Sequence, residues 1–331
     1  MKAYIKAVEY YLPETVITND DLVHEFPEWS VDKIAAKVGV TKRHIAADDE
    51  TATDLAIKAA EKLFSQGFNK QSIDYILFCT QSPDYLLPAS ACIIQHRLSM
   101  SNNIGALDFN QGCSGYIYGL SLAKGLIIAG IARNVLLLTA ETYNKRLHPR
   151  DKGNRTIFGD AASATLIAVD GFAEIGDFCL GTDGSGAESL IIKTGGSRNP
   201  EKSNLVEFDE HKNPVSPDYI YMDGAEIFSF TLSAVPSLLQ NTLGKNKIGK
   251  EEVDLFIFHQ ANKYMLDFLR KKLKIDENKF YMYLSEVGNT VSSTIPIALY
   301  EAMKTGIFKK GMKTIVAGFG VGLSWGGCLL K

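Results

Sequence analysis

The chain has 331 residues, of which 46% are hydrophobic and 22% are charged, and its formal net charge at pH 7 is −3. This composition is that of a globular protein with a sizeable core, and it excludes disordered and fibrous classes. The small negative charge gives no reason to expect nucleic acid or an anionic membrane surface as a partner.

The five cysteines are scattered and odd in number: Cys79, Cys92, Cys113, Cys179 and Cys328. They form neither a disulfide framework nor a zinc-binding spacing, so we expect no metal and a reducing, cytoplasmic location. The most apolar helical stretch, residues 120–132, contains Lys124 and is too short to cross a bilayer. No membrane-spanning segment is therefore expected.

Short apolar runs alternate along the chain with longer helical patterns, which predicts an α/β architecture. The expected strands are residues 75–79, 104–109, 135–138, 255–258 and 314–317. The expected helices are residues 53–66, 89–98, 114–130, 225–242, 263–272 and 294–306. Residues 193–217 contain Gly195-Gly196 and three prolines, which predicts a long loop between the two halves.

The two halves of the chain repeat one pattern. Cys113 and Asn289 each open an expected helix, and those helices stop at Gly130 and Gly306, so both pairs lie 176 residues apart (289 − 113 and 306 − 130). Any α/β protein repeats strand and helix, but the shared offset favours duplication of one unit. If the halves pack about a pseudo-twofold axis, both helix starts face one central site.

Cys113 lies in Gln111-Gly112-Cys113-Ser114, between an expected strand and a long apolar helix. A helix start presents unpaired N–H groups and a positive dipole end, and both stabilise a thiolate. The glycines beside the cysteine leave space for a substrate to reach the sulfur. These features indicate a nucleophile, although a free cysteine is more often a small buried packing residue.

Two further residues fit the same central site. His259 ends an apolar strand, where open α/β sheets bind ligands, although it could equally be a satisfied buried histidine. Asn289 starts a helix, where asparagine is also common as a cap. Near the end of the chain, Gly318, Gly320 and Gly322 follow a strand, and glycines there allow backbone N–H groups to face a substrate carbonyl.

Together these motifs form a recognisable order: Gln-Gly-Cys-Ser-Gly, His-Gln-Ala-Asn, Gly-Asn-Thr and a terminal Gly-x-Gly-x-Ser-Trp-Gly-Gly. With residues 39–45 and 157–161, the chain resembles the 3-oxoacyl-(acyl-carrier-protein) synthase III family of the thiolase superfamily nearly end to end. The resemblance implies a five-layered αβαβα fold of two duplicated halves, residues 1–170 with the cysteine and residues 171–331 with the histidine and asparagine. It also implies a homodimer.

The activity that the resemblance implies is a decarboxylative Claisen condensation that starts fatty-acid synthesis. Cys113 would take an acyl primer from acyl-CoA, and malonyl-acyl carrier protein would then lose carbon dioxide. His259 and Asn289 would stabilise the resulting enolate, and the backbone N–H groups of Cys113 and Gly322 would form the oxyanion hole. No cofactor is expected, because CoA and the carrier's phosphopantetheine serve only as substrate carriers.

The resemblance also assigns substrate contacts. The positions that match the family's CoA, pantetheine and acyl contacts are Lys33, Lys37, Lys152, Ile157, Phe158, Met222, Gly224, Ile227, Phe228, Asn262, Leu87 and Tyr143. The basic helix end that would dock the acidic carrier protein is Arg270, Lys271 and Lys272, which would act mainly by electrostatic steering.

Several positions depart from the family pattern. Lys33 stands where the family commonly has an adenine-stacking tryptophan, and Lys37 and Lys152 replace two arginines, which keeps the charge but loses the bidentate fork. Val321 replaces a glycine, and Tyr143 is bulkier than the usual aliphatic residue. The catalytic set is retained, whereas the carrier of the primer is left open.

Other functions share parts of this motif pattern. A superfamily acyltransferase would use Cys113 without decarboxylation, and a condensing enzyme of a specialised pathway would take a carrier-bound primer. Asn289 argues against the elongating enzymes with Cys-His-His, and neither Glu141 nor Glu188 lies in a motif of hydroxymethylglutaryl-CoA synthase. A non-catalytic acyl-binding partner is disfavoured because Cys113 is present.

Overall fold

The computed structural model describes residues 1–209 and 213–331. The strands of its central sheet are β1 (Tyr4–Tyr11), β4 (Tyr75–Cys79), β5 (Gly105–Phe109), β6 (Asn134–Glu141), β7 (Ala161–Ala168), β8 (Ala173–Thr182), β13 (Leu255–Phe258), β14 (Phe280–Tyr281), β15 (Thr314–Gly320) and β16 (Ser324–Leu330). They form one 10-stranded sheet in the order β14-β13-β15-β16-β8-β1-β7-β6-β4-β5.

Helices alternate with these strands along the chain. They are α1 (Asn19–Glu25), α2 (Val31–Val38), α3 (Ala52–Ser65), α4 (Ser90–Arg97), α5 (Gly115–Ile128), α6 (Lys152–Arg155), α7 (Gly224–Lys245), α8 (Lys263–Lys272) and α9 (Thr294–Lys304). Smaller strand pairs are β2 (Thr15–Thr18) with β3 (Lys42–Ile45), β9 (Leu190–Ile191) with β12 (Tyr221–Met222), and β10 (Glu207–Phe208) with β11 (Pro214–Val215).

The sheet consists of two halves with one topology. The first half-sheet is β5-β4-β6-β7-β1 and the second is β14-β13-β15-β16-β8, and they meet where β1 pairs with β8. In both, the first three strands run parallel and the remaining pairs are antiparallel. The chain order β1-α3-β4-α4-β5-α5-β6-β7 recurs as β8-α7-β13-α8-β14-α9-β15-β16. The duplication indicated by the sequence is therefore present in the fold.

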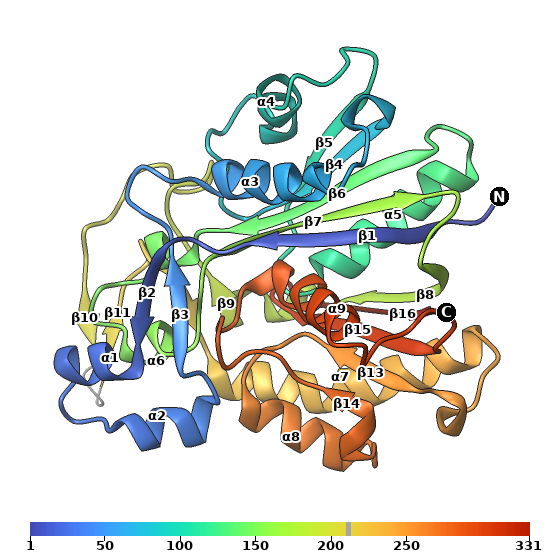
Figure 1. Cartoon of the computed structure of the whole chain (residues 1–331). Coiled ribbons are helices and arrows are strands. Elements are labelled where there is room, and N and C mark those ends of the chain that lie inside the picture. Colours follow the sequence, from blue (N-terminus) through green and yellow to red (C-terminus); the bar gives the residue numbers. More distant parts are fainter. Residues whose placement is uncertain (210–212) are drawn as a thin grey trace.

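The helices form three layers around the two half-sheets. Helices α3 and α4 cover the first half-sheet, and α7 covers the second, with α8 beside it (Figure 1). Between the half-sheets, α5 contacts strands of both, and so does α9. This is the expected five-layered αβαβα arrangement, and it places the starts of α5 and α9 at the interface between the halves.

The expected elements agree closely with the observed ones, with two informative differences. Asn289, which was expected to open the helix over residues 294–306, lies before a 3₁₀ turn, Val291–Ser293, and α9 itself begins at Thr294. The expected loop over residues 193–217 contains the described strands β10 and β11. The predicted division at residues 170 and 171 falls in the turn between β7 and β8, and it stays a prediction about domains.

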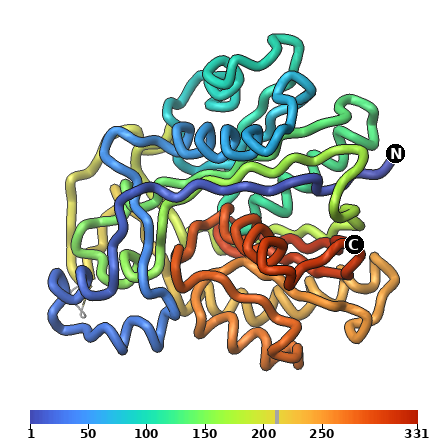
Figure 2. The backbone as a smooth tube through the Cα atoms, in the orientation of Figure 1, coloured from blue at the N-terminus to red at the C-terminus, as the bar shows by residue number. Residues whose placement is uncertain are grey.

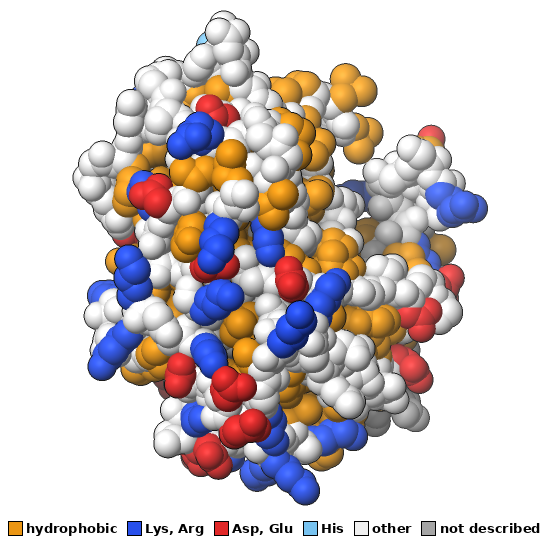
Figure 3. Space-filling view, turned by 90° about the vertical axis from the view of Figure 1, so that its right-hand side faces the viewer, with side chains coloured by type: hydrophobic (Ala, Val, Ile, Leu, Met, Phe, Trp, Pro, Cys, Tyr) orange, Lys and Arg blue, Asp and Glu red, His pale blue; other side chains and the backbone are white. Residues whose placement is uncertain are grey.

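Both chain termini lie at one edge of the molecule (Figure 2), where the backbone of Lys331 pairs with that of Glu174 and the Lys2 ammonium contacts the Glu174 carboxylate at 2.7 Å. Figure 3 shows a face on which basic, acidic and apolar side chains are interspersed. Within the described ranges, none of the helices combines the length and apolar character needed to cross a bilayer.

The core between α5 and the first half-sheet depends on close packing. Leu137 on β6 is fully buried, and a Cβ added at Gly119 of α5 would lie 2.5 Å from a Leu137 methyl carbon. We expect Leu137→Ala to reduce the free energy of unfolding by about 2–5 kcal/mol, because the cavity is lined by a rigid helix and sheet. Chemical denaturation measures it, with Leu205→Ala at a 65% exposed position as the control. A loss below about 0.5 kcal/mol, as for an ordinary surface change, would contradict this packing.

Candidate active site

Cys113 lies in the turn between β5 and α5 and packs directly on β15. A Cβ added at Gly318 would lie 2.7 Å from the Cys113 carbonyl oxygen, and one at Gly320 would lie 2.7 Å from the Cys113 sulfur. Because a side chain at Gly318 or Gly320 would collide with Cys113, only glycine at these positions allows the Cys113 turn to contact β15. The thiol is 7% exposed and packs in a cluster that includes Tyr143, Leu190 and Phe319.

The thiol is protonated in this environment, contrary to the expected thiolate. Burial raises the pKa of Cys113 to about 12, although the backbone N–H of Val321 bonds the sulfur and acts in the opposite direction. Desolvation disfavours the charged form, and here its effect exceeds that of the nearby donors. Helix α5 begins at Gly115, so Cys113 precedes its first turn.

The expected oxyanion hole, formed by the backbone N–H groups of Cys113 and Gly322, stays a prediction. The backbone N–H groups that favour the charged form of the Cys113 sulfur are those of Val321 and of Cys113 itself. Gly320, next to Val321, supplies the space that the sulfur occupies.

His259 follows β13 and is held by the second half-sheet, because its backbone N–H donates to the Ala317 carbonyl at 2.7 Å. The side chain is 2% exposed, and its Nδ1 lies 2.7 Å from the Thr294 hydroxyl. Burial lowers the pKa of His259 to about 3, although the Val291 backbone raises it somewhat. The imidazole is therefore neutral at physiological pH, as a hydrogen-bond donor to a thioester oxygen must be.

Asn289 is fixed by the strand-like pairing of its backbone with the segment before β7. Its N–H donates to Ile157 at 2.9 Å, and its carbonyl accepts from Gly159 at 3.0 Å. The side-chain Oδ1 accepts from the N–H of Val291 at 2.9 Å. This bond orients the amide, so that the two hydrogens on Nδ2 are left as donors.

A short chain of contacts brings the three residues to one place. The Thr294 hydroxyl that contacts His259 also lies 3.0 Å from the carbonyl of Val291, whose N–H bonds Asn289. On the other side, the His259 ring meets Phe319 edge-on at 5.9 Å, and Phe319 precedes Gly320, which contacts Cys113. The predicted nucleophile, histidine and asparagine thus lie near one another between the two halves of the chain, where the Cys113 turn packs on β15.

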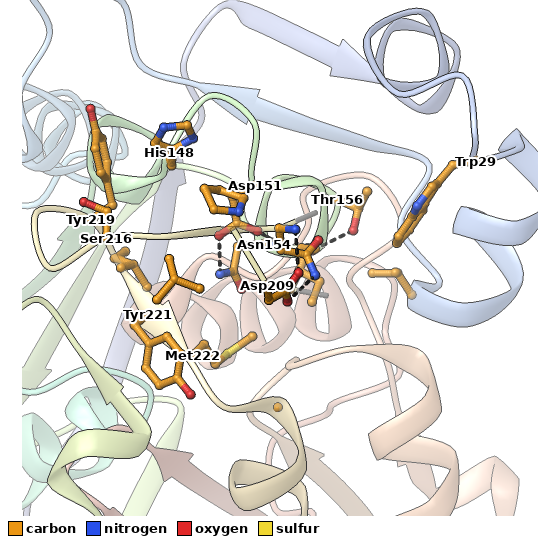
Figure 4. Close-up of a pocket in the computed structure, with 18 of the residues that line it drawn as sticks. Trp29, His148, Asp151, Asn154, Thr156, Asp209, Ser216, Tyr219, Tyr221 and Met222 are labelled. Atoms are coloured by element: carbon orange, nitrogen blue, oxygen red, sulfur yellow. Dashed lines mark hydrogen bonds between the residues drawn. The ribbon is translucent and has the colours of Figure 1, made fainter. Parts of the chain in front are cut away.

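A cavity of about 260 Å³ is lined by residues of α2, α6 and β12 and by Ile157 (Figure 4). Four of the predicted substrate positions line it: Lys37, Ile157, Met222 and Gly224. Trp29 also lines it, together with polar residues that the sequence did not single out, namely Asp151, Asn154, Asp209 and Tyr219. The side chain of Asp151 accepts from the Asn154 N–H as the cap of α6, a local role that a sequence pattern does not separate from ligand binding.

Other predicted substrate positions have different surroundings. The Lys33 ammonium lies over the Trp29 ring at 5.3 Å, and Lys152 pairs with Glu28 at 2.8 Å. Asn262 caps α8 through the N–H of Met265, and Phe228 stacks on Tyr264. Leu87 is 82% exposed and lines neither this cavity nor its neighbours among the described residues. Within one chain, the structure does not bring Leu87 to the site.

The remaining predicted residues are distributed around the site. Ile227 and Phe158 are buried in the cluster that contains Cys113, and the rings of Phe158 and Tyr143 lie 5.3 Å apart. Lys271 and Lys272 are exposed at the end of α8, whereas Arg270 lies 3.6 Å from the Glu277 carboxylate. Across residues 1–209 and 213–331, no group of three or more His, Cys, Asp or Glu side chains is placed to hold a metal ion.

Comparisons with known proteins point to one family. The sequence models of 3-oxoacyl-[acyl-carrier-protein] synthase III match residues 107–184, and those of its C-terminal part match residues 243–331. The beta-ketoacyl-[acyl-carrier-protein] synthase III of Clostridium perfringens is 38% identical over 324 residues, which cover 97% of this chain and 96% of the relative. That of Chlamydia caviae is 35% identical over 333 residues, with 100% and 97% coverage.

Solved structures show the same likeness. A crystal structure of a 3-oxoacyl-(acyl-carrier-protein) synthase III superposes with a TM-score of 0.98 at 50% identity, covering 100% of this chain and 99% of the other. The enzyme from Pseudomonas aeruginosa PAO1 superposes with a TM-score of 0.88 at 28% identity, covering 100% and 98%.

The protonated thiol leads to a test of the free protein. Alkylation by iodoacetamide requires the thiolate. With a pKa of about 12, we expect the alkylation rate of Cys113 to rise about tenfold per pH unit from about pH 7 to pH 10, without a plateau. Mass spectrometry of the Cys113 peptide measures the rate, with exposed Cys92 in the same digest as the reference. A plateau by about pH 8 would show a thiolate stabilised in spite of burial.

Proposed function

The chain belongs to the 3-oxoacyl-[acyl-carrier-protein] synthase III family and is a condensing acyltransferase of fatty-acid synthesis, and we propose that Cys113, His259 and Asn289 carry out its reaction. The observation that carries this assignment is the convergence of a buried thiol, a neutral imidazole and an oriented amide at the meeting of the half-sheets. The imidazole has the protonation state, and the amide the orientation, that the decarboxylation step requires.

The first step is transfer of an acyl group to the nucleophile. The Cys113 sulfur attacks the carbonyl of a primer thioester, the bond to the departing sulfur breaks, and the proton of the Cys113 thiol ends on the released thiol. The backbone N–H groups of Cys113 and Gly322 would stabilise the negative charge on the oxygen of the tetrahedral intermediate. Primer and product are both thioesters, so that neither an oxidant nor a metal enters the balance.

In the second step a malonyl thioester loses carbon dioxide. The electron pair of the broken C–C bond moves toward the thioester oxygen, where the Nε2–H of His259 and the Nδ2–H of Asn289 stabilise it. The carbanion then attacks the acyl-Cys113 carbonyl, and the Cys113 sulfur leaves and regains a proton. A neutral histidine suits this step, because an imidazolium would transfer its proton and quench the carbanion.

The partners follow from the surfaces around the site. We propose acyl-CoA or an acyl carrier as the primer donor and malonyl-acyl carrier protein as the extender, both entering through the cavity at Lys37 and Met222. Exposed Lys271 and Lys272, with Arg270, provide positive charge on α8 for an acidic carrier. The cytoplasm, where both substrates occur, is the proposed location.

A homodimer is also part of the proposal. Tyr85, Leu86 and Leu87 are 63%, 92% and 82% exposed, and Leu107 is 43% exposed on β5, the strand at the end of the sheet. Such an apolar surface on an edge strand is typical of a protein interface. In a dimer, Leu87 would bound the acyl site only from the partner copy.

The separate roles of the three residues are tested by half-reactions. We expect His259→Ala and Asn289→Ala each to lower the rate of malonyl decarboxylation about 10²–10³-fold, while both still accept an acyl group, since a lost donor weakens only the enolate. Cys113→Ala should not be acylated. Carbon dioxide release and intact mass measure the two steps, and Asn69→Ala is the matched control at an exposed capping asparagine. If His259→Ala lost both half-reactions equally, this would contradict the assignment of His259 to decarboxylation alone. If the parent protein were acylated but released no carbon dioxide, the acyltransferase function would be favoured.

Thr294 is expected to set the proton of His259. Its hydroxyl has one hydrogen, which donates to the Val291 carbonyl at 3.0 Å, and its oxygen lies 2.7 Å from His259 Nδ1. When the hydroxyl turns to donate to Nδ1 instead, the ring proton lies on Nε2, as the second step requires. Thr294→Val removes this donor while it keeps the side chain's shape.

We expect Thr294→Val to lower decarboxylation about tenfold or more and to leave acylation of Cys113 unchanged, since a wrong tautomer affects only steps that use Nε2–H. Thr294→Ser, which keeps the hydroxyl, should restore most of the rate. Nitrogen-15 NMR of the His259 ring reports the tautomer directly. A valine variant with Nε2 still protonated and with full activity would exclude this role.

A further inference from the structure

A second cavity of about 320 Å³ lies beside the Cys113 turn, separate from the one that Lys37 and Met222 line. One part of its wall is apolar and consists of Leu190, Ile191, Ile192, Ile220 and Val321, of which Leu190 and Ile220 are buried. The other part is polar, which is unusual for a place that would hold a fatty acyl chain. It includes Gln81, Asn110, Tyr143 and Arg146.

This cavity adjoins the nucleophile through three residues. Val321 lines it, and the Val321 N–H bonds the Cys113 sulfur. A Cβ added at Gly112, next to Cys113, would overlap the Val321 side chain and would lie 2.7 Å from Gln81 Oε1. Tyr143 packs in the same buried cluster as Cys113. An acyl group on the sulfur therefore has this cavity as its immediate neighbour.

The polar wall is held in place by internal hydrogen bonds. The Tyr143 hydroxyl donates to Gln81 Oε1, and Gln81 Nε2 donates to Asn110 Oδ1 at 3.0 Å. The backbone of Gln81 is itself anchored, because its N–H donates to buried Glu141 at 2.9 Å. The amide orientations are thereby fixed, and they leave a second hydrogen of Gln81 Nε2 and the Asn110 Nδ2 group as donors.

The charge of the cavity is one-sided. Arg146 is a cation with five N–H donors, and no Asp or Glu is among the described residues that line the cavity. Burial raises the pKa of nearby Glu141 to about 8, so this carboxyl carries little negative charge at pH 7 to oppose Arg146. A saturated chain would fill the apolar part of the wall but would leave these donors without an acceptor.

We infer that the acyl group accepted by Cys113 is short and ends in a hydrogen-bond acceptor, a carboxylate above all, and that Arg146 selects it. The methylene segment packs on Leu190 and Ile220, and the terminal carboxylate pairs with the guanidinium, which binds carboxylates through two parallel N–H bonds. The substrate class is thus the monothioester of a short dicarboxylic acid. This inference rests on the proposed role of Cys113 as the acyl acceptor.

The test compares two five-carbon primers that differ only at the far end, glutaryl-CoA and pentanoyl-CoA. Each is mixed with the full-length protein, and peptide mass spectrometry follows the rate at which Cys113 itself is acylated. Acetyl-CoA serves as a third, small primer, and Cys113→Ala reports any acylation elsewhere. We expect glutaryl transfer to be at least tenfold faster than pentanoyl transfer.

The variants separate recognition from folding. Arg146→Leu should lower the glutaryl rate at least tenfold and leave the acetyl rate within twofold, and Arg146→Lys should keep part of the preference. Arg150→Leu is the matched control, since Arg150 is exposed, lies over Phe208 at 4.4 Å and does not line this cavity. Thermal unfolding of each variant shows that the fold is kept.

Two outcomes would overturn the inference, and they are distinguishable. Equal or faster pentanoyl transfer by the parent protein, unaffected by Arg146→Leu, would exclude a carboxylate-selective primer site while leaving Cys113 as the acceptor. Failure of every thioester, acetyl-CoA included, to label Cys113 would instead overturn the proposed function on which the inference depends.

Discussion

The packing of the Cys113 turn against β15 is the contact on which the site depends. It is possible because Gly318 and Gly320 leave open the positions that a Cβ would take, so that a loop of the first half rests on a strand of the second. The same segment supplies the Val321 N–H that bonds the sulfur and the Phe319 ring, which meets the His259 ring edge-on at 5.9 Å. One close approach thus aligns a nucleophile from one half with a histidine and an asparagine from the other.

Burial at this contact has opposite consequences for the thiol and the imidazole. It raises the pKa of Cys113 to about 12 and lowers the pKa of His259 to about 3, because a low dielectric favours the neutral form of both groups. A neutral imidazole is what enolate stabilisation needs, whereas a neutral thiol is a weaker nucleophile. The site is therefore arranged more for the decarboxylation step than for rapid reaction with thiol reagents.

The sequence predicted the architecture well because the informative signals are local. The strands at residues 75–79 and 255–258 and the helix at residues 263–272 have the predicted bounds, since each is a continuous apolar or amphipathic run. The motifs around Cys113, His259 and Asn289 indicated one site because their order along the chain, together with the duplication, implied that the two helix starts face each other.

Other features could not be predicted, for physical reasons. The expected oxyanion donors are backbone N–H groups, which any residue supplies, so the glycine pattern alone does not show which N–H group faces the substrate carbonyl. The ion pair of Lys152 with Glu28 and the bonds from Tyr143 to Gln81 join residues far apart in the chain. Whether burial or the nearby helix start has the larger effect on the pKa of the Cys113 thiol depends on how completely the neighbouring strands exclude water.

The most direct measurement is a single turnover of the parent protein, followed by intact mass and carbon dioxide release. The protein is first charged with an acyl-CoA and then mixed with malonyl-acyl carrier protein. If Cys113 holds the acyl group during condensation, we expect one acyl group per chain on Cys113. We then expect this group to be lost together with equal amounts of carbon dioxide and 3-oxoacyl carrier. Acyl-Cys113 that persists in the presence of the malonyl carrier, or carbon dioxide released without discharge of Cys113, would contradict a condensation at this site.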